Sequence, residues 1–218
     1  LFEEINAFNK YLVINKIDYI PNSINFEKYK MWIKEEYKID KVKEINEIQN
    51  INQSILCMGY RNDFNINHPK YYQSLVFCEM FGGGYISDLF RVVREDNSLA
   101  YSIVSQMISD VKLMVIDAGI DKDKYHDVIN IINEILENYK KGIIDEELLE
   151  ISKISLISGI EETEDSAGAY IAYMLRNYLA NEDLTLEEAI NKIAATTKED
   201  IIEIAKGIHL DTIVLLSN

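Results

Sequence analysis

Residues 81–103, FGGGYISDLFRVVREDNSLAYSI, contain three consecutive glycines, two arginines and a tyrosine that follows a turn. The apolar spacing before this stretch predicts a helix over residues 70–81 that ends at the glycines. A second helix is expected over 85–95, and the polar residues 96–98 form a turn. The chain then enters a strand over 99–106. This stretch therefore predicts two helices packed closely together and connected to the edge of a sheet.

Gly82, Gly83 and Gly84 are interpreted as a structural turn that lets one helix swing tightly onto the next. A phosphate-binding loop needs a Lys and a Ser or Thr directly after its glycines, and here Tyr-Ile-Ser follows instead. A dinucleotide fingerprint needs spaced glycines between a strand and a helix, whereas these are consecutive and lie between two helices. The sequence therefore excludes a nucleotide site at the glycines.

The segments on both sides of this stretch indicate an α+β fold. Strands are expected over 54–60, over 110–120, which is close enough to the strand over 99–106 to form a hairpin with it, and over 211–218 at the end, with long helical gaps between them. This order predicts a mainly antiparallel sheet with helices packed on one face. The remaining helices are expected at 122–140, which stops at Gly142, and near 145–163, 166–180, 185–194 and 198–206.

The beginning of the chain has a different composition. Residues 11–19 read as a strand, and Pro21 precedes a segment in which apolar residues follow a helical spacing. Residues 39–53 are polar and charged, which makes them the best candidate for a domain join.

Composition limits the class of partner. The chain has 218 residues, 37 acidic and 22 basic, which gives a formal net charge of −15. A surface this negative repels nucleic-acid phosphates and anionic lipid. We therefore expect neither nucleic acid nor a membrane as a partner, and basic peptides are favoured. No apolar run approaches the roughly 18 residues of a membrane span, and the first residues lack a secretory signal pattern. Cys57 and Cys78 lie in apolar segments and are expected to be buried thiols in a reducing cytoplasm.

Metal chemistry has no support in this sequence. The three histidines, His68, His126 and His209, are far apart, and there is no HxxEH, HExxH or Cys/His cluster. Neither GxSxG nor SxxK occurs in an informative context, so a serine nucleophile is not indicated either. The many acidic pairs are expected from composition alone.

Arg94 and Tyr101 are the remaining candidates for a site. Arg94 falls in the last turn of the helix over 85–95, and the turn brings Tyr101 to the same end of the sheet. A guanidinium can hold a peptide carbonyl or carboxylate with two hydrogen bonds, and a phenol can donate to a developing oxyanion. The alternative from the residues alone is that Arg94 pairs with Glu95 or Asp96 and that Tyr101 is an ordinary strand aromatic.

The stretch HPKYYQSLVFCEMFGGGYISDLFRVVREDNSLAYSI (68–103) resembles the insulinase/pitrilysin-like (M16) zinc-peptidase family, and specifically its second, non-catalytic domain. The family pattern runs from a helix into Gly-Gly-Gly, then Ser-x-Leu-Phe, Arg-Glu and Leu-Ala-Tyr. Ser98 departs from it, because the family commonly has Gly there. The resemblance extends over roughly 45–218, since 196–218 looks like the end of the same domain. The matched residues are Gly82, Gly83, Gly84, Ser87, Leu89, Phe90, Arg94, Glu95, Leu99, Ala100 and Tyr101.

The resemblance implies an M16 metallopeptidase/LuxS-like fold and a division of the chain. Residues 1–40 would be the end of a preceding M16-like domain plus a linker, and 41–218 the inactive C-terminal domain. In such peptidases a zinc-bearing domain and a second domain of similar fold close on a peptide. Arg94 and Tyr101 would bind substrate there, while this chain holds no metal and zinc is expected on a partner domain or chain.

The resemblance thus predicts a non-catalytic domain that completes a peptidase site and is inactive alone. Its expected partners are an M16-like catalytic domain or subunit, within an oligomer, and a peptide or protein substrate. The alternative is an inactive M16-like scaffold that binds a peptide or partner subunit without peptidase activity. Residues 45–65 are also similar to a bacterial subgroup associated with modification of elongation factor P, in which a metal-free companion pairs with a zinc-bearing chain.

Overall fold

A five-stranded sheet organises the part of the chain that this computed structural model describes, residues 39–217. The strand order is β1-β5-β2-β4-β3. β1 runs parallel to β5, and all other neighbours are antiparallel. The strands are β1 (Lys43–Ile48), β2 (Ser54–Arg61), β3 (Ala100–Ile108), β4 (Leu113–Ile120) and β5 (His209–Ser217).

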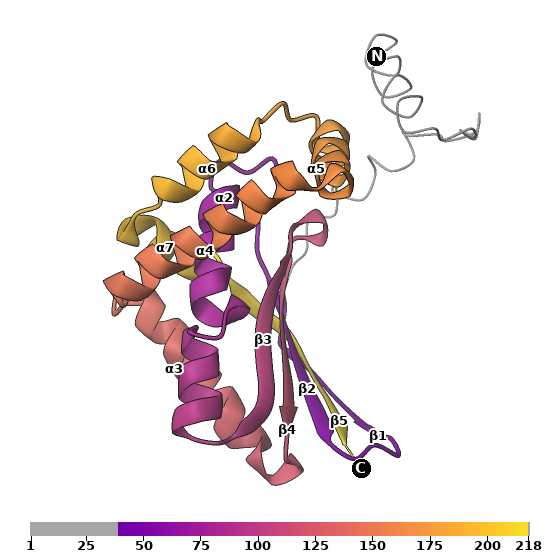
Figure 1. The fold of residues 1–218 in the computed structure, drawn as a ribbon. Helices are drawn as coiled ribbons and strands as arrows, with labels where there is room; N and C mark the ends of the chain where they lie inside the picture. The colour runs from indigo at the N-terminus through magenta and orange to yellow at the C-terminus, as the bar shows by residue number, and fades with distance from the viewer. Residues whose placement is uncertain (1–38, 218) are drawn as a thin grey trace, which may run out of the picture. The chain divides into compact units, whose positions relative to one another are not determined.

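The helices lie on one face of this sheet (Figure 1). The predicted α+β class, with a mainly antiparallel sheet and helices on one side, is confirmed. The α-helices are α2 (Tyr71–Cys78), α3 (Tyr125–Lys140), α4 (Glu146–Asp165), α5 (Ala167–Ala180), α6 (Leu186–Ala194) and α7 (Lys198–Lys206). Two π-helical segments, η2 (Glu79–Gly83) and η3 (Leu89–Asp96), follow α2, and the 3₁₀ turns η4 (Ser109–Val111) and η5 (Lys122–Lys124) flank β4.

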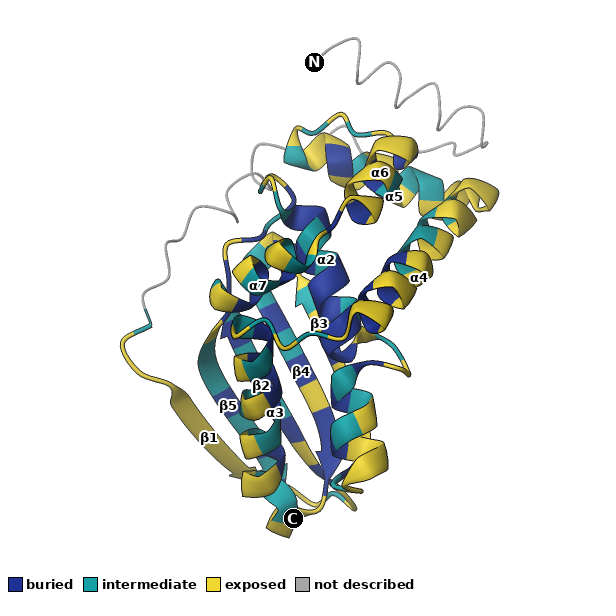
Figure 2. Cartoon of the chain, turned by 90° about the vertical axis from the view of Figure 1, so that its left-hand side faces the viewer, coloured by how far each residue is buried: buried dark blue, intermediate teal, exposed yellow. Residues whose placement is uncertain are grey.

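Alternating side chains make the sheet two-sided. In β2, Leu56, Met58 and Tyr60 are fully buried under the helices, whereas Ile55 and Cys57 point to the opposite face and are partly exposed. This is the period-two alternation of a strand with one face in the core. Figure 2 shows the same dark and light alternation along the strands. The face away from the helices is therefore open within residues 39–217.

Local signals define several helix ends. Gly142, at φ 79°, ends α3 in a left-handed conformation that glycine adopts without strain. α6 and α7 each begin with a capping box, Thr185 with Glu188 and Thr197 with Asp200. These ends agree with the predicted stop at Gly142 and the predicted starts near 185 and 198.

The segment 39–53 differs from its prediction as a domain join. Residues 43–48 form β1, an edge strand whose six residues are all exposed. Both faces of β1 are in contact with solvent, so the strand can carry charged residues on each face. A polar, charged composition is also typical of a linker, which is why the sequence predicted one. The predicted strand over 11–19, the helix after Pro21 and the assignment of residues 1–40 to a preceding domain lie outside the described residues, apart from positions 39 and 40.

The helices predicted over 70–81 and 85–95 are shorter and wound differently. α2 changes to π-helix at Glu79, and η3 begins only at Leu89, after an irregular segment. Wider π turns insert an extra residue per turn and are common at functional sites. The spacing of apolar residues in the sequence does not reveal π-helical turns, because one extra residue changes that spacing only slightly.

Two further findings concern the whole described region. No helix between residues 39 and 217 is long and apolar enough to cross a membrane. Cys57 and Cys78 are both free thiols, as predicted, with Cys78 buried and Cys57 partly exposed.

Candidate functional site

The turn between η3 and β3 places both predicted site residues near one end of the edge strand. The amide of Leu99 donates to the carbonyl of Val93 over 2.9 Å, and the amide of Ser98 donates to Arg94 over 3.1 Å. This is a Schellman-like stop, wider by one residue because the preceding helix is a π-helix. Ser98 has φ 52°, a left-handed conformation that costs a non-glycine residue about 1 kcal/mol. The chain therefore forms the turn even though Ser stands where the M16 pattern has Gly.

Arg94 lies exposed in the last turn of η3. Its guanidinium carbon is 4.7 Å from the ring centre of Phe90, which is a cation–π contact. Arg94 is a cation at the end of its helix, but no ion pair joins it to Glu95 or Asp96 in the described part of the chain. Among the described residues, Arg94 keeps its hydrogen-bond donors free of acidic partners while stacking holds its position.

Tyr101 occupies an irregularity in β3. The register with β4 shifts between Ala100 and Ser102, so Tyr101 leaves the regular alternation and its side chain is 59% exposed. Bulges of this kind re-aim a side chain at strand ends. The Tyr101 phenol donates to both carboxylate oxygens of Asp121, over 3.0 and 3.2 Å. This hydrogen bond, and the negative charge of Asp121, raise the pKa of Tyr101.

Arg94 and Tyr101 are thus both at the surface, on consecutive elements, but their contacts are separate. Arg94 stacks on Phe90, and Tyr101 bonds to Asp121 at the end of β4. Sequence reasoning missed Asp121, because only the pairing of β3 with β4 brings it beside Tyr101. As the domain stands, the Tyr101 proton is engaged and the Arg94 guanidinium is available.

Gly82 is needed for close approach rather than for an unusual backbone angle. None of Gly82, Gly83 and Gly84 has positive φ. A Cβ on Gly82 would lie 2.9 Å from the backbone nitrogen of Ser105 in β3, so only glycine lets η2 contact the strand. A Cβ on Gly83 or Gly84 would mainly meet the end of the Glu79 side chain, which can move. Gly82 is therefore the glycine that brings the helical segment onto the sheet.

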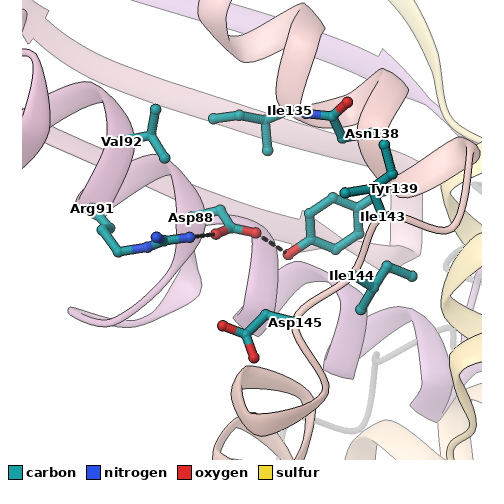
Figure 3. A pocket seen from close by; sticks show the side chains of 9 residues that line it. All are labelled: Asp88, Arg91, Val92, Ile135, Asn138, Tyr139, Ile143, Ile144 and Asp145. Atoms are coloured by element: carbon teal, nitrogen blue, oxygen red, sulfur yellow. Dashed lines mark hydrogen bonds and ion pairs between the residues drawn. The ribbon is translucent and has the colours of Figure 1, made fainter.

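A second polar group lies on the other side of η3, in a pocket of about 300 Å³ formed with α3 and the loop before α4. Asp88 accepts a hydrogen bond from the Tyr139 phenol over 2.7 Å and one from Arg91 over 2.6 Å (Figure 3). Burial, with the neighbouring Asp88 charge, raises the pKa of Tyr139 well above its ordinary value. Neither Arg94 nor Tyr101 lines this pocket.

Sequence reasoning did not identify Asp88 or Tyr139, which lie 51 residues apart. The Tyr139 ring packs edge-on against Phe77 and Phe81, with centroid distances of 5.4 and 5.8 Å. The hydrogen bond from Tyr139 to Asp88 therefore holds the start of η3, the helix that carries Arg94, against a ring that the core keeps in place. This contact positions η3, and no sequence signal connects its two residues.

The described residues do not fit a zinc ion. No group of three or more His, Cys, Asp or Glu side chains within residues 39–217 could hold a metal. His68 is engaged with the amide of Lys70 and the ring of Phe64, and His126 contacts the ring of Tyr125. No catalytic step in this domain is therefore assigned to a metal held by its own residues.

Comparison with known proteins gives a consistent result. A family model described as the peptidase M16 inactive domain matches residues 15–156, which is more than half of the chain. This range starts before residue 41, where sequence reasoning begins the domain. In Bacillus subtilis, the probable inactive metalloprotease YmfF is 30% identical over 174 residues, covering 80% of this chain and 41% of that protein. The uncharacterized zinc protease YmxG is 27% identical over 185 residues, covering 84% and 44%.

Solved structures show the same fold. A conserved protein from Enterococcus faecalis V583 is 32% identical with a TM-score of 0.81, covering 84% of this chain and 43% of that one. A peptidase M16 inactive domain from Pseudomonas fluorescens has a TM-score of 0.70 at 16% identity, covering 84% and 45%. The chain thus spans less than half the length of these similar proteins.

Proposed function

Because this chain belongs to the peptidase M16 family as an inactive domain, we propose that it completes a peptidase site whose metal is held by another domain or chain. The observation that carries this proposal is Arg94, an exposed guanidinium with no carboxylate partner among the described residues. A surface arginine in a chain of net charge −15 readily acquires an acidic neighbour, and this one stacks on an aromatic ring instead. It is prepared to bind a group from outside the domain.

Arg94 binds the backbone of a peptide substrate through a carbonyl or carboxylate oxygen. Its planar fork donates two parallel hydrogen bonds, which fixes the orientation of the bound group as well as its position. Stacking on Phe90 and the Asp88–Tyr139 contact limit the movement of η3, so little entropy is lost on binding.

Tyr101 donates a hydrogen bond to the oxyanion that develops on the scissile carbonyl. The phenol is protonated at neutral pH because its ordinary pKa is about 10, and Asp121 raises that pKa further, so a donor is present at neutral pH. The hydrogen bond from Tyr101 to Asp121 must break before the phenol can donate its proton to the oxyanion instead. Closure against the metal-bearing domain therefore includes a rotation of the Tyr101 phenol away from Asp121.

The face of the sheet that the helices leave open belongs to the proposed contact with the metal-bearing domain. Ile55 and Val104 are exposed on it, and Asp117 lies beside Cys57 in the register of β2 with β4. An acidic domain attracts basic peptides and repels nucleic acid and anionic membrane. The assignment to the cytoplasm rests on two free thiols.

The test is reconstitution with a metal-bearing M16 partner and an assay of peptide cleavage. We expect the 218-residue chain alone to cleave nothing and to contain no stoichiometric zinc by elemental analysis. In the assembly, Arg94→Ala lowers turnover by roughly 10²-fold without changing the folding transition. Lys206→Ala, which removes an exposed cation on α7 without touching η3, is the control and leaves turnover within about twofold. Equal turnover of the Arg94→Ala and wild-type assemblies would refute the role of Arg94.

An inactive scaffold is the second candidate function. The Tyr101–Asp121 hydrogen bond favours it, because a phenol already donating to a carboxylate is not available to an oxyanion. Asp121→Ala, which removes the acceptor altogether, discriminates the two when it is tested in the assembly. If the site is active, freeing the phenol maintains or raises turnover, while Tyr101→Phe lowers it about 10²-fold. A scaffold binds its partner equally well in both variants and shows no cleavage with any of them.

A further inference from the structure

Helix α5 is apolar on nearly every side yet mostly exposed. Its sequence, AGAYIAYMLRNYLA, contains Arg176 as its one charged residue. Only Asn177 is buried. A helix that is hydrophobic all round is normally covered on all sides, but part of the surface of α5 is not covered by any segment within residues 39–217.

One side of α5 already has its contacts. The Asn177 amide and the Tyr173 hydroxyl both donate to the carbonyl of Leu184, over 3.1 and 2.9 Å. The guanidinium of Arg176 lies 5.2 Å from the ring centre of Tyr71. These interactions fix the rotation of α5 about its own axis and determine which side faces the domain.

The opposite side carries an apolar stripe. Apolar residues recur there at i, i+3, i+4, i+7 and i+8. At 100° per residue Leu175 and Leu179 lie about 160° from Asn177, while Met174 and Tyr178 lie about 60° and about 100° from it, on the flank of the stripe. Met174, Tyr178 and Leu179 are 47%, 38% and 36% exposed. Figure 2 shows α5 at the margin of the helical layer, with exposed residues along it. The α5 stripe consists of Ile171, Met174, Leu175, Tyr178 and Leu179.

Acidic residues lie at both ends of this stripe. The last turns of α4 lead directly into α5, and the loop to α6 follows it. Between Lys153 and Lys192, Arg176 is the only basic residue, and it is stacked on Tyr71. The acidic residues in the same interval are Glu161, Glu162, Glu164, Asp165, Glu182, Asp183, Glu187 and Glu188.

We propose that the α5 stripe docks an amphipathic helix of a partner protein, with its apolar face on the stripe and lysine or arginine residues beside the acidic ends. Helix-in-groove recognition uses apolar anchors at this spacing. A second copy of this chain would place acidic ends against acidic ends, and an anionic lipid surface would be repelled in the same way. The charge pattern therefore selects a basic partner.

The site is tested on the full 218-residue chain with ¹³C-methyl methionine labels. The chain has six methionines, and Met174→Leu assigns the signal of interest. The probe is a Leu/Lys amphipathic peptide of about 18 residues, long enough to form a helix, and its control is the matched Leu/Glu peptide. We expect the Met174 methyl signal to shift with the Leu/Lys peptide and to remain unchanged with the Leu/Glu peptide.

Affinity is measured by anisotropy of the labelled Leu/Lys peptide. Met174→Glu with Leu179→Glu places charges on the stripe at exposed positions, so folding is retained, and we expect affinity to fall at least about tenfold. Ile48→Glu, an exposed apolar residue on β1, is the control and leaves affinity unchanged.

Three outcomes would overturn the proposal. Equal binding of both peptides would show non-specific apolar adsorption. A dimer in sedimentation that the double variant abolishes would make the stripe an interface between copies. A Met174 methyl already shielded from a soluble paramagnetic agent in the free chain would show that the chain covers its own stripe.

Discussion

Two tyrosine–aspartate pairs in this domain use the same chemistry in opposite surroundings. The phenol of Tyr139 donates to Asp88 over 2.7 Å at the edge of the core, and that of Tyr101 donates to Asp121 over 3.0 and 3.2 Å at the surface. Tyr139 is 1% exposed and Tyr101 is 59% exposed. The Tyr139 ring is held by the core, so its hydrogen bond fixes structure, whereas the exposed Tyr101 pair can open toward another group.

The largest expected difference between the pairs comes from removing each ring. Tyr139→Ala leaves a cavity between Phe77 and Phe81 and should lower the free energy of unfolding by about 3–5 kcal/mol. Tyr101→Ala should change it by no more than about 0.5 kcal/mol, because the ring is solvated. Urea unfolding followed by circular dichroism measures both, and a comparable loss in the two variants would break the comparison.

Removing only the hydroxyl groups gives the next largest effect. Tyr139→Phe leaves the ring in place but deprives the Asp88 carboxylate of a buried donor, which should cost about 1.5–3 kcal/mol. Tyr101→Phe should be nearly neutral for stability, because water replaces the lost donor at Asp121. The same urea titrations provide the measurement. A cost at Tyr101→Phe as large as that at Tyr139→Phe would mean that Asp121 is not accessible to water.

The pH dependence of the free energy of unfolding should show a smaller effect, which comes from Tyr139. Because the folded pKa of Tyr139 is raised above the ordinary value of 10.0, the unfolded chain releases this proton first. The contribution of Tyr139 to stability is therefore complete below pH 10 and is lost as pH rises further. Stability of the wild type should fall more steeply above pH 10 than that of Tyr139→Phe, by up to about 1.4 kcal/mol per pH unit. Parallel curves would contradict a protonated Tyr139 in the folded state.

The smallest effect concerns the exposed pair alone. Asp121 raises the pKa of Tyr101 chiefly by accepting its hydrogen bond. Asp121→Ala, which removes both the acceptor and the charge, should therefore shift the Tyr101 titration down toward 10.0, as followed by tyrosinate absorbance in difference with Tyr101→Phe. The control is Asp110→Ala, which leaves the titration in place. An unchanged titration in Asp121→Ala would show that the phenol is not bonded to this carboxylate in solution.

Much of the fold could be predicted because it depends on contacts close in sequence. The stop of α3 at Gly142, the starts of α6 and α7 at their capping boxes, and the hairpin of β3 with β4 are all local. Strand β1 was not predictable. It is polar on both faces and belongs to the sheet only through pairing with β5, at the other end of the chain.

The candidate site divides in the same way. Arg94 and Tyr101 were found from the motif and the turn between them, and both are exposed in the structure. Asp121 lies beside Tyr101 at the end of the hairpin that the sequence predicts, but sequence reasoning did not pair these two residues. Asp88 meets Tyr139 across 51 residues, and no sequence signal joins them. The π winding that leaves Arg94 over Phe90 was also invisible, since it shifts the helical pattern by one residue.

The sequence by itself determined the fold class, the family and the two exposed side chains, because periodicity, caps and glycine spacing act over a few residues. The tertiary structure alone decided which phenol is locked and which can open, and which side of α5 is left uncovered. These properties depend on which distant side chains exclude water from a given group. Exclusion of water is a property of the packed chain, and no short stretch of sequence contains it.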